Sequence, residues 1–192
     1  MPFISAKARE DAASSGSTKD GYLNPSSIKS GQKVRFTLLA EEPFMFYELW
    51  GNDVNDPQKR KPFRFLEDPT PEDISVKLGN NFVRSLSRDG KGNEPSRIAH
   101  AVPIYNYDLE RVQVFSWTQK TITQALDNIS QLEDYADSMT ECDFYLYRDG
   151  EGTDTRYTVQ AAPKKKAMAK TVDEEWDAAQ DEGFDLSRLI DG

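Results

Sequence analysis

Alternation of apolar and polar residues predicts strands in much of the chain between residues 28 and 163. Lys33 to Leu39 alternates in this way, and Phe44 to Trp50 follows after a Glu-Glu-Pro break, so two strands joined by a short turn are expected. A second pair of strands is predicted from Arg97 to Tyr107 and from Arg111 to Thr118. An Asp-Leu-Glu turn separates the members of this second pair.

Two segments depart from the strand pattern. From Gly51 to Pro95 the chain is broken by Asn, Asp, Gly and Pro, which predicts a long excursion with a small helix near Pro71. Later, apolar residues recur at steps of three and four, which predicts a helix with Thr118 as its N-cap. The apolar positions of that helix are Ile122, Ala125, Leu126, Ile129 and Leu132.

The last strands form a predicted hairpin. Cys142 to Tyr147 alternates, the chain turns at Gly150-Glu151-Gly152, and Tyr157 to Ala161 alternates again before the globular part ends near Pro163. Strands, one helix and a closing hairpin predict a mainly β fold, an OB-like Greek-key barrel with the helix at one end. An SH3-like barrel or an unrelated α+β sheet would give a similar order, whereas one good helix excludes an α/β sandwich.

The two ends of the chain differ from the domain predicted over 28–163. Residues 1–27 are rich in Ser, Ala, Gly and Lys without an apolar period, which predicts an arm that is flexible or only partly ordered. Residues 164–192 predict a linker and a disordered acidic tail, in which apolar residues at helical spacing would bind a partner. A C-terminal helix packed on the barrel is the alternative. The partner-binding positions expected in the tail are Trp176, Phe184, Leu186, Leu189 and Ile190.

Composition limits the chemistry. The formal net charge is -9, so binding of nucleic acid requires basic residues that are gathered locally. One cysteine, Cys142, and one histidine, His100, exclude a disulfide framework and leave little for a zinc site or a His-based catalyst. We therefore expect no cofactor, no metal and no enzymatic activity. The lone cysteine favours a reducing setting. Because no apolar run has the length of a signal peptide or a membrane span, we expect a cytoplasmic protein without a membrane partner.

Basic and aromatic residues are interleaved between residues 47 and 117. Cations can follow a phosphate backbone while aromatic rings stack on unpaired bases, each stack contributing about 1 to 3 kcal/mol irrespective of the base. Period-two geometry gathers Arg97, Tyr105 and Tyr107 on one strand face, and similarly aligns Arg111 with Phe115 and Trp117. The expected DNA-contacting residues are Tyr47, Trp50, Lys59, Arg60, Lys61, Arg64, Phe65, Arg84, Arg88, Arg97, Tyr105, Tyr107 and Arg111.

Several strings resemble those of the single-stranded-DNA-binding proteins of tailed phages, including cyanophage types. They include Ile28 to Phe36, Phe46 to Trp50, Tyr105-Asn106-Tyr107, Arg111 to Val114, Thr118 to Ile122, Gly150-Glu151-Gly152 and Thr155 to Val159. The resemblance implies an OB-fold that coats unwound DNA during phage replication and recombination, in the cytoplasm of the infected cell. It also implies an acidic tail that meets replication proteins such as polymerase, helicase-primase or nuclease. A homodimer is left open.

The resemblance has two departures. This sequence lacks the Cys/His cluster with which some phage members hold structural zinc, and it ends in Ile190-Asp191-Gly192 instead of a terminal phenylalanine.

A tethered acidic tail would compete with DNA for the basic groove, because its effective concentration there is high. Two other functions fit the sequence: an adaptor that uses the tail alone, and a metal-dependent nuclease built on Glu72, Asp73 and Lys77.

Overall fold

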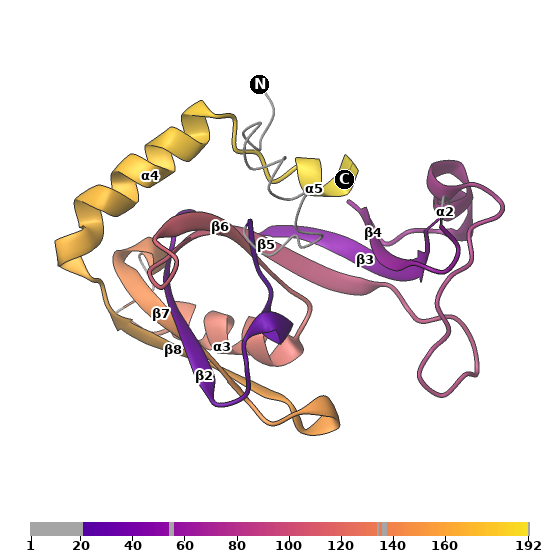
Figure 1. Ribbon diagram of the computed structural model, residues 1–192, viewed down its shortest axis with the longest axis horizontal. Helices are drawn as coiled ribbons and strands as arrows, with labels where there is room; N and C mark the ends of the chain where they lie inside the picture. Colours follow the sequence, from indigo (N-terminus) through magenta and orange to yellow (C-terminus); the bar gives the residue numbers. More distant parts are fainter. Residues whose placement is uncertain (1–20, 54–55, 134, 136–137, 192) are drawn as a thin grey trace. The chain divides into compact units, whose positions relative to one another are not determined.

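The computed structural model describes residues 21–53, 56–133, 135 and 138–191 (Figure 1). The chain divides into two compact units. The first takes in the described residues of Met1–Pro43 and Ala101–Leu186, and the second those of Phe44–His100 and Ser187–Gly192. Whereas one domain over 28–163 was expected, the second unit is built largely from the predicted excursion. The described chain is mainly β, with few helices.

An open mixed sheet forms the first unit, in the order β1-β6-β5-β2-β7-β8. β2 is antiparallel to both β5 and β7, β7 is antiparallel to β8, and β1 is parallel to β6. The strands are β1 (Tyr22–Leu23), β2 (Gln32–Leu38), β5 (Arg97–Asn106), β6 (Arg111–Trp117), β7 (Cys142–Asp149) and β8 (Arg156–Pro163). Strand β5 contributes its residues from Ala101 onward to this unit. The predicted strands are thus confirmed, and so is the closing hairpin.

The core of the first unit lies between the sheet and helix α3 (Lys120–Ser130). Ile122 and Ile129 of the helix join a cluster of buried strand residues that includes Phe36 and Phe144, whose rings stack at 5.7 Å. Figure 1 shows α3 beside β8. The predicted helix is confirmed, but Gln119 takes the N-cap position expected for Thr118.

A buried amide pair fixes the hairpin between β5 and β6. The side-chain Nδ2 of Asn106 donates a 2.8 Å hydrogen bond to Oε1 of Gln113, and both residues are buried. Asn106 Oδ1 also accepts a hydrogen bond from the backbone of Asp108 in the turn. Glu110 completes the turn at a φ of 50°, in the left-handed region. Both the nitrogen and the oxygen of the Asn106 amide therefore have hydrogen-bond partners inside the protein.

The last residues of the predicted N-terminal arm, 21–27, are described by the structure and contact the rest of the first unit. Tyr22 and Leu23 pair with Val114 and Phe115 of β6, and Leu23 and Pro25 are buried. These contacts hold Tyr22, Leu23 and Pro25 against the rest of the first unit, although the segment shows no long hydrophobic period. Residues 1–20 of the predicted arm lie outside the described residues.

The second unit contains a hairpin of β3 (Phe44–Asn52) and β4 (Arg60–Phe65), together with helix α2 (Pro71–Leu78). β3 also pairs with β5, whose first residues belong to this unit. The small predicted helix near Pro71 is confirmed. Thr70 and Asp73 form a capping box at its start, which satisfies backbone donors there. The unit also includes helix α5 (Arg188–Asp191).

The prediction of a disordered tail over 164–192 was wrong for the described residues. Helix α4 (Ala169–Asp181) follows β8, and Val172 of this helix is 2% exposed. Met168 and Val172, four residues apart, give the segment an apolar side that packs on the sheet, while Glu174 and Glu175 stay exposed. Figure 1 shows α4 alongside β6. The remaining short helices are η1 (Pro25–Ser27), η2 (Met139–Glu141), η3 (Gly152–Asp154) and η4 (Lys166–Met168).

Candidate nucleic-acid interface

The β3–β4 hairpin places cations beside aromatic rings on one of its faces. Its register sets Trp50 opposite Pro62 and Glu48 opposite Arg64, so that Trp50, Arg60 and Arg64 share this face. The Arg60 guanidinium lies 5.2 Å from the ring centre of Trp50, and that of Arg64 lies 5.6 Å from the ring of Phe46. The indole nitrogen of Trp50 donates to Glu48 at 3.0 Å, which orients the indole.

The opposite face of the hairpin carries a second set. Tyr47 is opposite Phe65, and Lys61 Nζ lies 5.2 Å from the ring centre of Phe63. Lys77 Nζ reaches from α2 to 5.1 Å from the ring of Phe65, which is buried. The hairpin residues expected to form one DNA-contacting set are therefore divided between two faces, because the period of two separates neighbours along each strand.

Three of the predicted arginines converge on Glu94. The guanidinium groups of Arg60 and Arg97 each pair with its carboxylate at 2.5 Å, and Arg84 Nε donates to its backbone oxygen at 2.8 Å. One carboxylate thus offsets part of the positive charge of this group. Arg60 and Arg97 remain about half exposed, so water or a phosphate can still reach them. Lys59 and Arg88 are exposed in the connecting segments.

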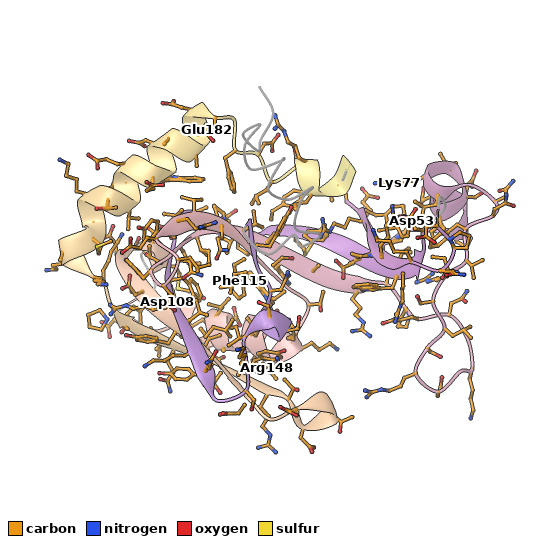
Figure 2. The ribbon with its side chains drawn as sticks, in the orientation of Figure 1. Asp53, Lys77, Asp108, Phe115, Arg148 and Glu182 are labelled. Carbon is orange, nitrogen blue, oxygen red and sulfur yellow. The ribbon has the colours of Figure 1, made fainter. Side chains whose placement is uncertain are left out.

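Helix α5 binds two of the cations of the second unit. Arg64 Nη1 donates to the backbone oxygen of Leu189 at 3.3 Å, and Lys77 Nζ donates to that of Ile190 at 2.7 Å. Figure 2 shows Lys77 close to α5. Leu189 itself is buried. These carbonyl oxygens occupy the hydrogen-bonding positions that phosphate oxygens would need.

Tyr105 and Tyr107, expected on an exposed DNA-contacting surface, are buried. They form a cluster with Val172 of α4, and their rings meet edge to face at 5.4 Å. Burial raises the pKa of both phenols, and the charge of Asp143 adds to the effect on Tyr107. The hydroxyl of Tyr105 has no hydrogen-bond partner among the described residues. Period-two geometry did put both rings on the face away from the α3 core, but α4 covers that face.

For β6, the next strand, the face itself was predicted wrongly. Phe115 and Trp117 were aligned with Arg111 on the basic, aromatic face, yet both rings belong to the core cluster that contains Ile122. Figure 2 shows Phe115 among the side chains that fill this region. β6 is apolar on both faces, with Val112 packed against the Tyr105 cluster, so alternation alone could not assign its faces. Arg111 is exposed at the start of the strand.

A further set of cations and rings was missed by the sequence analysis. We call Lys33, Arg35, Tyr145 and Tyr147 the tyrosine face, because the register of β2 and β7 sets Lys33 opposite Tyr147 and Arg35 opposite Tyr145. Lys33 Nζ lies 4.5 Å from the ring centre of Tyr145, and the Arg35 guanidinium lies 5.3 Å from it. The alternation of residues 142–147 already indicated that Tyr145 and Tyr147 point away from the core.

The predicted tail residues are divided between the two units. In the first unit, the rings of Trp176 and Phe184 meet edge to face at 5.1 Å, and Leu186 is half-buried. In the second, Leu189 is buried and Ile190 is half-buried. All five residues, which were expected to bind a partner, are therefore at least partly buried by the chain itself.

The remaining residues considered for catalysis or metal binding take part in local structure or are at least partly buried. Asp73, one of the carboxylates considered for a nuclease site, belongs to the capping box of α2. Burial raises the pKa of the Cys142 thiol to about 11, and burial lowers the pKa of His100. Within the described ranges, no group of three or more His, Cys, Asp or Glu side chains is arranged to hold a metal ion.

Comparison of the chain with protein-family models, curated proteins and solved structures finds no match. Among the residues that the structure describes, no helix combines the length and the apolar character needed to cross a membrane.

Proposed function

We propose that this protein binds single-stranded DNA without regard to base sequence, with the β3–β4 hairpin as a principal contact. The observation that carries the proposal is the pairing of a cation with an aromatic ring on each face of the hairpin: Arg60 with Trp50 on one face, and Lys61 with Phe63 on the other. Cations of this kind can track a backbone, and a half-buried ring such as Trp50 keeps a surface on which a base can stack.

An OB-like barrel in the first unit is part of the proposal. The order β6-β5-β2-β7-β8, with α3 between β6 and β7 in sequence, agrees with a five-stranded, partly open Greek-key barrel. In that fold, the second and third strands and the loop before the second strand bind oligonucleotides. Counted from β2, these are β5, β6 and the segment between β2 and β5, which contains the β3–β4 hairpin.

The C-terminal segment would compete with DNA in both units. In the first unit, α4 covers Tyr105 and Tyr107. In the second, backbone oxygens of α5 accept hydrogen bonds from Arg64 and Lys77. A strand that stacks on the tyrosines or places phosphates on these cations must displace the segment, which is tethered and so competes at high effective concentration.

Once displaced, the acidic segment would recruit replication proteins, such as a polymerase, a helicase-primase or a nuclease, during phage DNA replication and recombination in the host cytoplasm. Its apolar residues at helical spacing are of the kind that docks into a partner's groove. A chain that lacks residues 171–192 should accordingly bind single strands more tightly and lose the capture of such partners. Retained capture by the shortened chain would contradict the recruiting role.

Titration of the full chain with fluorescent oligo-dT tests the proposal. Binding should weaken steeply between about 50 and 200 mM salt, because counterions are released from the phosphates. Trp50→Ala should reduce the affinity by about 1 to 3 kcal/mol, while Trp50→Phe, which keeps an aromatic face, should retain most of it. No binding at about 50 mM salt would overturn the proposal, and a loss that is equal for both variants would remove Trp50 from the interface.

A further inference from the structure

The tyrosine face lies on the side of β2 and β7 that points away from the α3 core. The alternate residues of the same strands, among them Phe36, Phe144 and Leu146, fill that core and are fully buried. Tyr145 and Tyr147 are only half-buried, and their ring centres are 6.1 Å apart. Part of each ring is therefore open to solvent, because the core residues of β2 and β7 lie on the opposite side of the sheet.

The charge of this face is mostly positive, in a chain whose formal net charge is -9. Its buried acid, Asp143, is engaged by Arg35 at 2.6 Å, by the Tyr107 hydroxyl at 3.0 Å and by the backbone nitrogen of Lys165 at 3.1 Å. Lys33 is exposed, and no carboxylate among the described residues pairs with it. The positive charge of Lys33 is thus available to an anionic ligand.

Neighbouring residues extend the cationic character. Lys165 Nζ lies 5.3 Å from the ring of Tyr107, and Lys164 and Lys166 flank it directly after β8. The strand β8 pairs with β7 and sets Thr158 opposite Tyr147 and Gln160 opposite Tyr145. Both are exposed and can exchange hydrogen bonds with polar groups of a ligand.

We infer that the tyrosine face is a second contact surface for single-stranded DNA, with bases stacked on Tyr145 and Tyr147 and phosphates near Lys33 and Lys165. This inference rests on the proposed function and adds a surface that is distinct from the β3–β4 hairpin. A single strand is favoured over an acidic peptide because alternate residues of a strand, about 6.6 Å apart, present two flat rings in series beside the cations. An acidic peptide would use the cations but not the rings.

Binding of oligo-dT to the full chain tests the inference, with Lys33→Ala and Tyr147→Ala compared with Lys29→Ala and Tyr22→Ala. Lys29 is exposed and Tyr22 half-buried, and both lie outside the tyrosine face, which makes them matched controls. The Tyr147 variant should bind about 5- to 150-fold more weakly than wild type, and the Lys33 variant should show a smaller salt dependence. Photocrosslinking of the wild-type chain to an oligonucleotide with 5-iodouracil should label Tyr145 or Tyr147.

The outcomes separate the two proposals. If the wild-type chain binds no single strand, both fail. If it binds and Trp50→Ala weakens it, but Lys33→Ala and Tyr147→Ala match their controls and neither tyrosine is crosslinked, the second surface alone is overturned. Should Tyr147→Ala fail to fold, Lys33→Ala and the crosslink decide. Unchanged DNA affinity with Lys33-dependent binding of a poly-glutamate peptide would assign the face to an acidic protein, and would also overturn the inference.

Discussion

The hydroxyl of Tyr107 donates a 3.0 Å hydrogen bond to the carboxylate of Asp143, and both residues are buried. The same carboxylate accepts hydrogen bonds from Arg35 and from the backbone of Lys165. Burial acts to lower the pKa of Arg35, but the hydrogen bond and the charge of Asp143 outweigh it, so that this pKa is raised. One carboxylate of β7 therefore joins β2, the residue that follows β5 and the segment that leads into α4.

Tyr107→Phe should lower the free energy of unfolding by about 1 kcal/mol, because the buried carboxylate loses one donor while the ring packing stays. Urea denaturation monitored by circular dichroism measures the change. Tyr145→Phe, which removes a hydroxyl from a half-buried ring, is the control and should change stability less. Equal stability of the two variants would show that the Tyr107 hydroxyl does not help to hold Asp143.

Val172→Asp should loosen α4 from the sheet, because a carboxylate would be buried against the apolar rings of Tyr105 and Tyr107. If α4 competes with DNA, this variant binds oligo-dT more tightly than wild type. Val76→Asp, at a position of α2 that is 84% exposed, adds the same charge and should leave affinity close to that of wild type. Equal or weaker binding by Val172→Asp, with the domain still folded, would argue against competition by α4.

Lys77→Ala should release α5, because the lysine donates to the backbone oxygens of both Arg64 and Ile190. Trypsin should then cleave after Arg188 faster than in wild type, which mass spectrometry detects as loss of the last four residues. Lys59→Ala, which also removes an exposed lysine from this unit, is the control. An unchanged rate of cleavage would mean that Leu189 and Arg64 suffice to hold the helix.

Glu41 makes stability depend on pH in the acid range. Its carboxylate accepts hydrogen bonds from Ser138 at 2.9 Å, from the backbone of Met139 at 3.1 Å and from Thr140 at 2.5 Å. The hydrogen bond from Thr140 is the largest cause that lowers the pKa of Glu41 below its ordinary value of 4.5. The stabilisation is therefore complete well above pH 4.5 and is lost as the pH falls through the lowered pKa of the folded state.

Glu41→Gln should cost about 1 kcal/mol of unfolding free energy at pH 7, a small value because the side chain is exposed to solvent. The difference from wild type should shrink as the pH falls below 4. Thermal unfolding at several pH values measures it. Glu42→Gln, at the adjacent exposed position, should show no such convergence, and a difference between Glu41→Gln and wild type that is independent of pH would contradict this account.

Local patterns were sufficient for most elements of the fold. The alternation in β2, β7 and β8 identified these strands and their core faces, and the steps of three and four identified α3. In these elements, one face is apolar and the other is polar, so the pattern determines the orientation. Tyr105 and Tyr107 were likewise assigned to the side away from the α3 core.

The packing of α4 on Tyr105 and Tyr107 could not be predicted from such local patterns. Val172 lies far from Tyr105 along the chain, within a segment whose many acids are typical of disorder, and only tertiary packing brings them together. The tyrosine face was missed for a related reason. Lys33 and Tyr147 become neighbours through the pairing of β2 with β7, which the pattern of either strand alone does not reveal.

The amide pair of Asn106 and Gln113 makes the alignment of β5 with β6 hard to change. A slip of one residue would set each amide beside an apolar neighbour and leave a donor and an acceptor without water or partner, at a cost of about 1 to 3 kcal/mol for each. The two side chains thus discriminate against misaligned versions of the hairpin. A hydrophobic replacement of both could preserve stability while allowing the strands to settle in more than one alignment.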